Sequence, residues 1–237
     1  AYRTLQLPDL PRQLRMRLET SRSRCLRLSG SMTEARMMVK GPEPKKARPV
    51  KGTGTGAGYT SEFKNERNLA LIEATRLMEL GEIDTAESKY PAAERCFLMA
   101  LELSQKYDDR ALEGQVLGNI GNIDLYKGEL DKAVAHYTQS LYIARETGDQ
   151  HREGINLSNL GNAYLHISEL DEAVAHYTQS LYIAREIGDK LSEGIQLGNI
   201  GSVHQLNGKL DLAVEHYTQS IDIAREIGNK GSEGINL

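Results

Sequence analysis

The sequence is poor in the residues that mark several classes of protein. It has no Trp, two Phe and 5% aromatic residues in all. Nowhere do 18 apolar residues run together, so the sequence predicts no membrane span. Its two cysteines, Cys25 and Cys96, are too few for a disulfide scaffold and favour a reducing compartment. What remains is a chain of 237 residues, long enough for one or two domains with a core.

Charge and proline divide the chain into two parts. Residues 1–60 hold five of the six prolines and 13 Lys and Arg against 4 Asp and Glu, a net charge of +9. Residues 61–237 hold 16 basic and 29 acidic residues, a net charge of −13. The first part buries too little apolar surface to offset its ordering entropy. We therefore predict a disordered basic arm over 1–60 and a folded acidic body over 61–237.

The acidic body is built from repeats of 40 residues. The string HYTQS returns without slippage at 136–140, 176–180 and 216–220. A divergent first copy and three close copies cover about 64–109, 110–149, 150–189 and 190–229, and a stub follows at 230–237. Because the pattern is still repeating at Leu237, we expect the sequence to be part of a longer protein.

Each copy predicts two helices joined by a short turn. In the third copy, Leu157, Leu160 and Tyr164 recur at helical spacing, and Ala173 and Tyr177 do so again after the turn. Small residues at matching positions allow close packing of the two helices: Gly121, Gly161, Gly201, Ser140 and Ser180. One helix pair cannot bury its apolar face alone, so neighbouring pairs stack. The predicted fold class is all-α, a solenoid of four helix pairs.

The residues that carry a family resemblance are Asn159-Leu160-Gly161-Asn162-Ala163-Tyr164, followed by Ala173, Tyr177 and Ser180. They resemble the tetratricopeptide repeat, over about three quarters of the chain. The 40-residue period with Leu-Gly-Asn tripeptides is similar to the repeats of G-protein signalling modulators and kinesin light chains. The resemblance implies a right-handed superhelix whose first helices line a concave, protein-binding groove. Asp124 and His204 depart from the aromatic consensus at Tyr164 and leave gaps for other side chains to fill.

On this resemblance, recurring asparagines point into the groove. Neighbouring helices lie about 8–10 Å apart, and an extended chain rises about 3.3 Å per residue, so each repeat matches about three peptide residues. Amides donate and accept hydrogen bonds, which suits a peptide backbone. Apolar residues on the same helices would accept the side chains of the peptide. The candidate site therefore consists of Asn119, Asn122, Tyr126, Ile155, Asn159, Asn162, Leu165, Ile195, Asn199 and Ser202. The open alternative is that these asparagines only satisfy neighbouring backbone groups.

No catalytic or cofactor motif stands out, so we predict a protein that is not an enzyme and needs no cofactor. One histidine per repeat, at His136, His176 and His216, spaces the rings about 10 Å apart, which is too far for a shared zinc ion. We interpret these as surface or packing residues, and the tyrosines that follow them as core. The groove positions Gly118, Ile155 and Ile195 offer no cation, so a clamp for a chaperone's C-terminal carboxylate is not expected.

The predicted function is a cytoplasmic scaffold that binds an extended, neutral or basic segment of a protein partner. Alternatives rest on the arm: it resembles an organelle transit peptide, or it binds RNA in an organellar assembly factor. The chain also fits the sensor segment of a larger regulator. No membrane partner is expected. Since no capping helix follows the fourth copy, we expect Ile223 and Ile227 to be exposed and the chain to self-associate.

Overall fold

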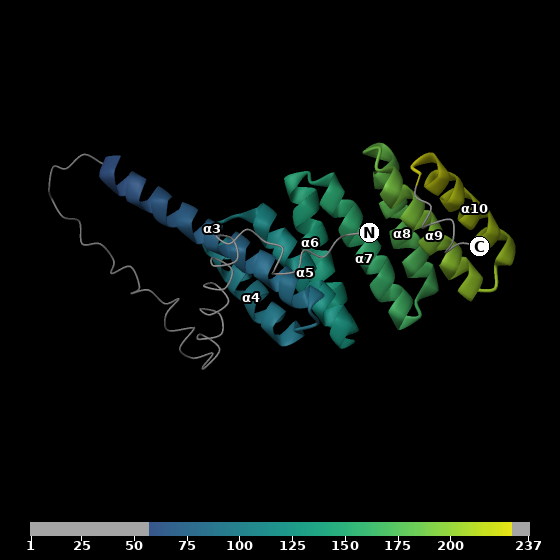
Figure 1. The fold of residues 1–237 in the computed structure, drawn as a ribbon, viewed down its shortest axis with the longest axis horizontal. Helices are drawn as coiled ribbons and strands as arrows, with labels where there is room; N and C mark the ends of the chain where they lie inside the picture. Colours follow the sequence, from purple (N-terminus) through teal and green to yellow (C-terminus); the bar gives the residue numbers. More distant parts are fainter. Residues whose placement is uncertain (1–56, 229–237) are drawn as a thin grey trace. The chain divides into compact units, whose positions relative to one another are not determined.

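The computed structural model describes residues 57–228, with side chains from residue 66 onward. Within this range every regular element is an α-helix, and the chain divides into two compact units after Asp109 (Figure 1). The predicted all-α solenoid of helix pairs is confirmed. Residues 1–56 and 229–237 lie outside the described range, so the predictions for the basic arm and the stub remain predictions.

The first unit contains α3 (Ala57–Ala86) and α4 (Tyr90–Lys106), which pack against each other. Pro91 lies in the first turn of α4, where its missing N–H costs no helical bond. Phe97 of α4 is buried directly against Gly81 of α3, where an added Cβ would lie 2.5 Å from the ring. The close contact fixes this pair of helices in the register that the 40-residue period predicts.

The second unit contains three helix pairs. Its helices are α5 (Arg110–Lys127), α6 (Leu130–Thr147), α7 (Gln150–Ile167), α8 (Leu170–Glu186), α9 (Lys190–Leu206) and α10 (Leu210–Glu226). Each first helix packs against the second helix of its own pair, and α6 and α8 also pack against the first helix of the next pair. The unit is therefore a stack in which every internal helix has neighbours on two sides.

Glycine and aspartate set the boundaries between the pairs. Gly148 has a φ of 71° after α6 and Gly188 has a φ of 72° after α8, left-handed conformations that cost glycine little. The next residue, Asp149 or Asp189, caps the following helix by accepting a backbone N–H at 3.0 Å. The dipeptide Gly-Asp recurs at both boundaries, so the same helix end and cap recur with the 40-residue period.

The core of the second unit lies between one repeat and the next. Ala133, Tyr137 and Leu141 of α6 form one buried cluster with Leu157 and Leu160 of α7. The corresponding residues of α8 and α9 form a second cluster one repeat later, made up of Ala173, Tyr177, Leu181, Leu197, Ile200 and Val203. Because each cluster draws on two repeats, neither repeat buries its apolar face without the other.

The last helix differs from its predecessors because no described helix covers its outer face. Leu210 and Val214 are each 63% exposed, whereas their counterparts in α8 are half-buried. The predicted exposure of Ile223 is wrong: it is half-buried, because it packs against the second core cluster. Ile227 is 40% exposed, close to the 38% of Ile187 in an internal repeat, so a missing neighbour does not explain it.

The glycine at the centre of each first helix gives a stability prediction. A Cβ at Gly161 would lie 2.6 Å from the buried ring of Tyr177, so Gly161→Ala forces the ring to move. We expect a net loss of about 1–2 kcal/mol, since overpacking outweighs the helix propensity gained. The matched control is Gly154→Ala, whose Cβ meets Ile183 at an ordinary 3.5 Å and should stabilise the helix slightly. Urea unfolding of both variants measures the difference; equal effects would contradict the prediction.

Candidate functional site

The candidate site lies along the first helices of the second unit, α5, α7 and α9. Each of these helices carries two half-buried polar residues one turn apart: Asn119 and Asn122, Asn159 and Asn162, and Asn199 and Ser202. The polar positions recur at the predicted interval, so each first helix presents an uncharged polar pair at the same place.

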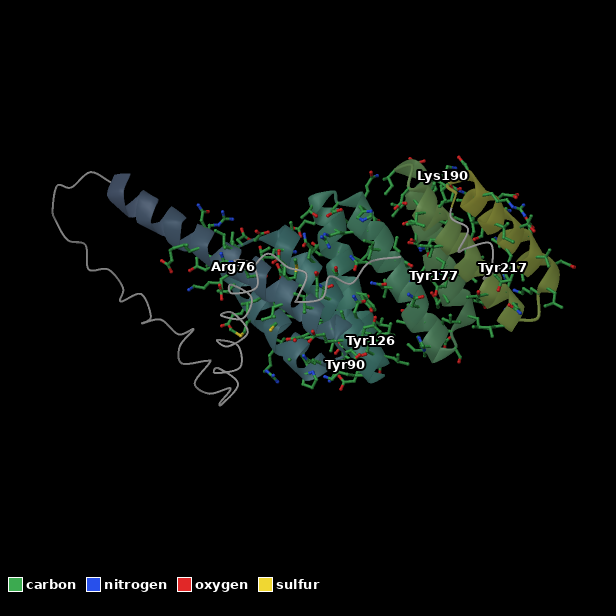
Figure 2. The ribbon with its side chains drawn as sticks, viewed as in Figure 1. Arg76, Tyr90, Tyr126, Tyr177, Lys190 and Tyr217 are labelled. Atoms are coloured by element: carbon green, nitrogen blue, oxygen red, sulfur yellow. The ribbon has the colours of Figure 1, made fainter. Side chains whose placement is uncertain are left out.

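A tyrosine from the second helix holds one amide in each of the first two pairs. The Tyr137 hydroxyl donates to Asn122 Oδ1 at 2.8 Å, and the Tyr177 hydroxyl donates to Asn162 Oδ1 at 2.6 Å (Tyr177 is labelled in Figure 2). Burial raises the pKa of Tyr177 to about 12 and also raises that of Tyr137, so both hydroxyls stay protonated donors. Each bond occupies the amide oxygen and orients the amide N–H groups.

Other polar residues of this face contact one another. Asn159 Nδ2 donates to Asn122 Oδ1 at 3.4 Å and so joins α7 to α5. In α9, Asn199 Nδ2 donates to Gln196 Oε1 at 3.3 Å. Asn159 and Asn199 therefore each donate a hydrogen bond to another side chain.

The four apolar candidates lie in different environments. Tyr126 is 60% exposed, Ile195 49% and Ile155 43%. Leu165 is half-buried and packs against the core cluster of α8 and α9, so its side chain is partly used by the fold. Ile155 and Ile195, together with Asn159, line a hollow of about 570 Å³, including its open mouth, between α7 and α9.

The serine three residues after each recurring second-helix tyrosine has a role that sequence reasoning missed. Ser140, Ser180 and Ser220 each donate from Oγ to a first-helix carbonyl, at Gly114, Gly154 and Gly194 respectively, over 2.6–2.8 Å. The sequence identified these serines only as small. The signal available in the sequence was that each serine lies 26 residues after a glycine that also recurs in every close repeat.

In each close repeat, the histidine of the second helix contacts the residue at the position where the family consensus has an aromatic. In successive repeats the pairs are Asp124 with His136, Tyr164 with His176, and His204 with His216. The first is a 2.6 Å hydrogen bond, the second a pair of stacked rings 5.1 Å apart, and the third a pair of tilted rings 5.2 Å apart. The predicted packing role therefore includes a specific partner in each repeat.

Ion pairs connect the second helix of one repeat to the first helix of the next repeat. Arg145 of α6 donates to Glu153 of α7 at 2.7 Å, and Arg185 of α8 donates to Glu193 of α9 at 2.8 Å. These residues explain why Ala-Arg-Glu and Glu-Gly recur in phase. Burial raises the pKa of Glu193, but hydrogen bonds from Arg185 and Lys190 lower it to a net value below its ordinary one.

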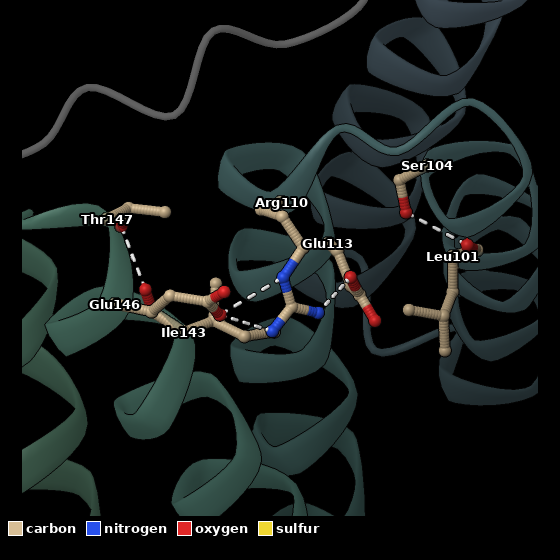
Figure 3. Close-up of polar contacts among 7 residues, drawn as sticks. All are labelled: Leu101, Ser104, Arg110, Glu113, Ile143, Glu146 and Thr147. Atoms are coloured by element: carbon tan, nitrogen blue, oxygen red, sulfur yellow. Dashed lines mark hydrogen bonds and ion pairs between the residues drawn. The ribbon is translucent and has the colours of Figure 1, made fainter.

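The start of α5 carries a variation on this arrangement. Arg110 donates from Nε and Nη2 to Glu146 of α6 at 3.2 and 2.6 Å, and from Nη1 to Glu113 at 2.6 Å (Figure 3). These contacts tie the two helices of one repeat, whereas the later arginines tie different repeats.

The described residues offer no group of three His, Cys, Asp or Glu side chains placed to hold a metal ion. Between residues 57 and 228, each helix is too short or too polar to span a bilayer.

The chain belongs to the tetratricopeptide repeat family. The family model matches residues 72–146 and 152–226, which together make up more than half of the sequence. No curated protein sequence matches the chain.

Solved structures with a similar fold share little sequence with the chain. Aspartyl phosphate phosphatase F from Bacillus subtilis is 15% identical, with a TM-score of 0.68 over 70% of this chain and 44% of its own. A Rap protein complexed with competence and sporulation factor is 15% identical, with a TM-score of 0.63 over 75% and 55%. A putative kinesin light chain with nearly identical repeats, from Podospora anserina, is 16% identical, with a TM-score of 0.59 over 90% and 97%. The chain thus spans less than half the length of the phosphatase.

Two histidines give a prediction for the pH dependence of stability. Burial lowers the pKa of His176 and of His204, and each has a buried Nδ1 atom that makes no hydrogen bond. The unfolded chain then binds more protons below about pH 6.5, so stability should fall as the pH drops from 7.5 towards 5. Urea unfolding at both ends of this range measures the loss.

The control for this prediction is His204→Gln, which cannot gain a proton at that position. We expect its loss of stability between pH 7.5 and 5 to be smaller than that of the unchanged chain, because all other titrating groups are shared. An equal loss in the two proteins would show that His204 does not contribute.

Proposed function

We propose that this chain is a non-catalytic scaffold that binds an extended segment of a protein partner along α5, α7 and α9. The observation that carries the proposal is the row of tyrosine-oriented and helix-bridging amides on these three helices. Membership of the tetratricopeptide repeat family supports the proposal, because such repeats are typically protein-interaction modules. Within the family, we propose the Leu-Gly-Asn type of repeat, on the strength of the 40-residue period.

The amide geometry suits a peptide backbone. Tyr137 and Tyr177 hold the amide oxygens of Asn122 and Asn162, so the amide N–H groups are oriented before a partner arrives. Such preorganisation reduces the entropy that binding loses. The repeat spacing of about 8–10 Å corresponds to about three residues of an extended chain, so successive repeats meet equivalent backbone groups.

Charge favours a neutral or basic segment. None of the ten candidate site residues is charged, so a charged side chain placed on them would lose hydration without gaining a counter-charge. Residues 61–237 carry a net charge of −13, which attracts a basic partner over a longer range and accelerates association at low salt.

Two known structures bear on the proposal. A Rap protein of similar fold has been solved with competence and sporulation factor bound, so this architecture accommodates a binding partner in that protein. As a second candidate function we propose the sensor segment of a larger regulator; aspartyl phosphate phosphatase F, which has a similar fold, is a longer protein of which the chain spans 44%. RNA binding or organelle targeting through the arm concerns residues outside the described range and stays a prediction.

Removal of the asparagine that recurs every 40 residues on the first helices tests the proposed function. We expect the triple variant Asn119→Ala, Asn159→Ala and Asn199→Ala to bind groove peptides about tenfold or more weakly, because hydrogen bonds of about 0.5–1.5 kcal/mol each are lost. The measurement is fluorescence anisotropy with peptides selected on the full chain from a displayed library of random 12-residue sequences.

The matched control removes amides from the second helices with Gln139→Ala and Gln179→Ala, both exposed positions. Circular dichroism and urea unfolding establish that each variant is folded. Unchanged peptide affinity in a folded asparagine variant would contradict the proposed function.

We also propose that the outer face of α10 mediates self-association of this chain, because Leu210 and Val214, one turn apart on this helix, are both exposed. Light scattering at rising concentration should show dimers, and Val214→Lys should return the chain to a monomer. The control Glu215→Gln changes the net charge equally on a neighbouring exposed position. A monomer at high concentration for the unchanged chain would contradict this proposal.

A further inference from the structure

The hollow between α7 and α9 differs from the same place one repeat earlier. Its floor comes from α8, where Ser180, Ile183 and Ala184 are buried. Its walls include Ile155 of α7 and Ile195 of α9. The hollow is open to solvent, so it offers room for a side chain of a larger molecule.

Three isoleucines surround this hollow. Ile155, Ile187 and Ile195 line it and are 43%, 38% and 49% exposed, so each offers apolar surface that the fold does not bury. At the equivalent positions between α5 and α7 the residues are Gln115, Thr147 and Ile155. The α7–α9 site is therefore apolar on all three sides, whereas the α5–α7 site is polar on two.

The polar groups around the hollow are largely occupied. Ser158 donates to Gln196 across the two first helices at 3.1 Å, and Gln196 is buried. At one end, Asp189 accepts the backbone N–H and the hydroxyl of Ser192, which hold its pKa below the ordinary value against the opposing effect of burial. These donors are neutral, so the Asp189 carboxylate at that end stays ionised, whereas the floor of Ser180, Ile183 and Ala184 carries no charge.

Resting on the proposed function, we infer that the partner segment anchors an aliphatic side chain between Ile155, Ile187 and Ile195. The floor and the three isoleucines carry no charge, and the charged Asp189 lies at one end, so the surface between the isoleucines matches an uncharged aliphatic side chain. The neighbouring site between α5 and α7 then receives the side chain about three residues away, where Gln115 and Thr147 favour a hydrogen-bonding group. The recognised segment therefore carries an aliphatic and a polar residue three positions apart.

Peptides selected from the random 12-residue library on the full chain test the inference. They should be enriched in a Leu, Ile, Val or Met residue with a polar residue three positions away on one side. The double variant Ile155→Gln and Ile187→Thr gives the α7–α9 site the residues of its neighbour. It should bind these peptides at least tenfold more weakly, because their aliphatic side chain loses its apolar surroundings.

The matched control is Ile227→Thr. Ile227 occupies the position of Ile187 one repeat later and is exposed to the same extent, but it does not line the hollow. The control should leave affinity unchanged. Because Ile155, Ile187 and Ile227 are all exposed, these substitutions should not unfold the chain, and urea unfolding checks this for each variant.

A gain-of-function variant provides an independent test of the inference. Gln115→Ile with Thr147→Ile makes the α5–α7 site apolar on three sides as well. Peptides selected on this variant should carry two aliphatic residues three positions apart, and peptides selected on the unchanged chain should not.

The outcomes separate this inference from the proposed function. Peptides that lose affinity in the asparagine variant, yet show no aliphatic preference and ignore Ile155→Gln with Ile187→Thr, overturn the anchor but leave groove binding intact. Peptides that ignore both sets of substitutions overturn both. Failure to select any peptide that binds the chain also overturns both.

Discussion

The close contact between a second-helix tyrosine and a first-helix glycine supports both the fold and the proposed groove. Tyr137 and Tyr177 are fully buried, and a Cβ on Gly121 or Gly161 would lie within 2.8 Å of their rings. The hydroxyls of the same two rings donate hydrogen bonds to the amide oxygens of Asn122 and Asn162, which belong to the candidate site. One side chain therefore sets how closely two helices approach and how the polar face is oriented, so a change in core packing changes the site.

The fold could be predicted from the sequence because its signal is repeated. Gly148 and Gly188 end helices, Asp149 and Asp189 cap them, and a strict 40-residue interval fixes which residues correspond. Each of these local rules depends on a few neighbouring residues, so a single chain carries enough information. The inward-facing positions are also periodic, which is why most of the core was predictable.

The side-chain partners were harder to predict because they depend on distances between helices. The sequence identified the loss of the aromatic at Asp124, but the second-helix His136 that occupies the gap comes from another helix twelve residues later. Likewise, Leu165 fits the groove pattern, yet its contact with the core of the next repeat leaves it half-buried. Ile223 was expected to be exposed because no repeat follows, yet it packs against the core cluster of α8 and α9, of which α9 belongs to its own repeat. The spacing of residues shows which of them share a face of a helix, but it does not show which side chain of another helix they contact.

Periodicity that builds the scaffold also creates a problem for recognition. A groove of identical repeats would bind an extended segment equally well in registers shifted by about three residues, because every repeat offers the same amides. Specificity is a difference between affinities, so it has to come from positions that differ between copies. Gln115, Ile155 and Ile195 occupy one such position, and Thr147 and Ile187 occupy another. On the proposed function, the positions that differ between repeats and contribute little to the core are therefore the ones that we expect to select one register.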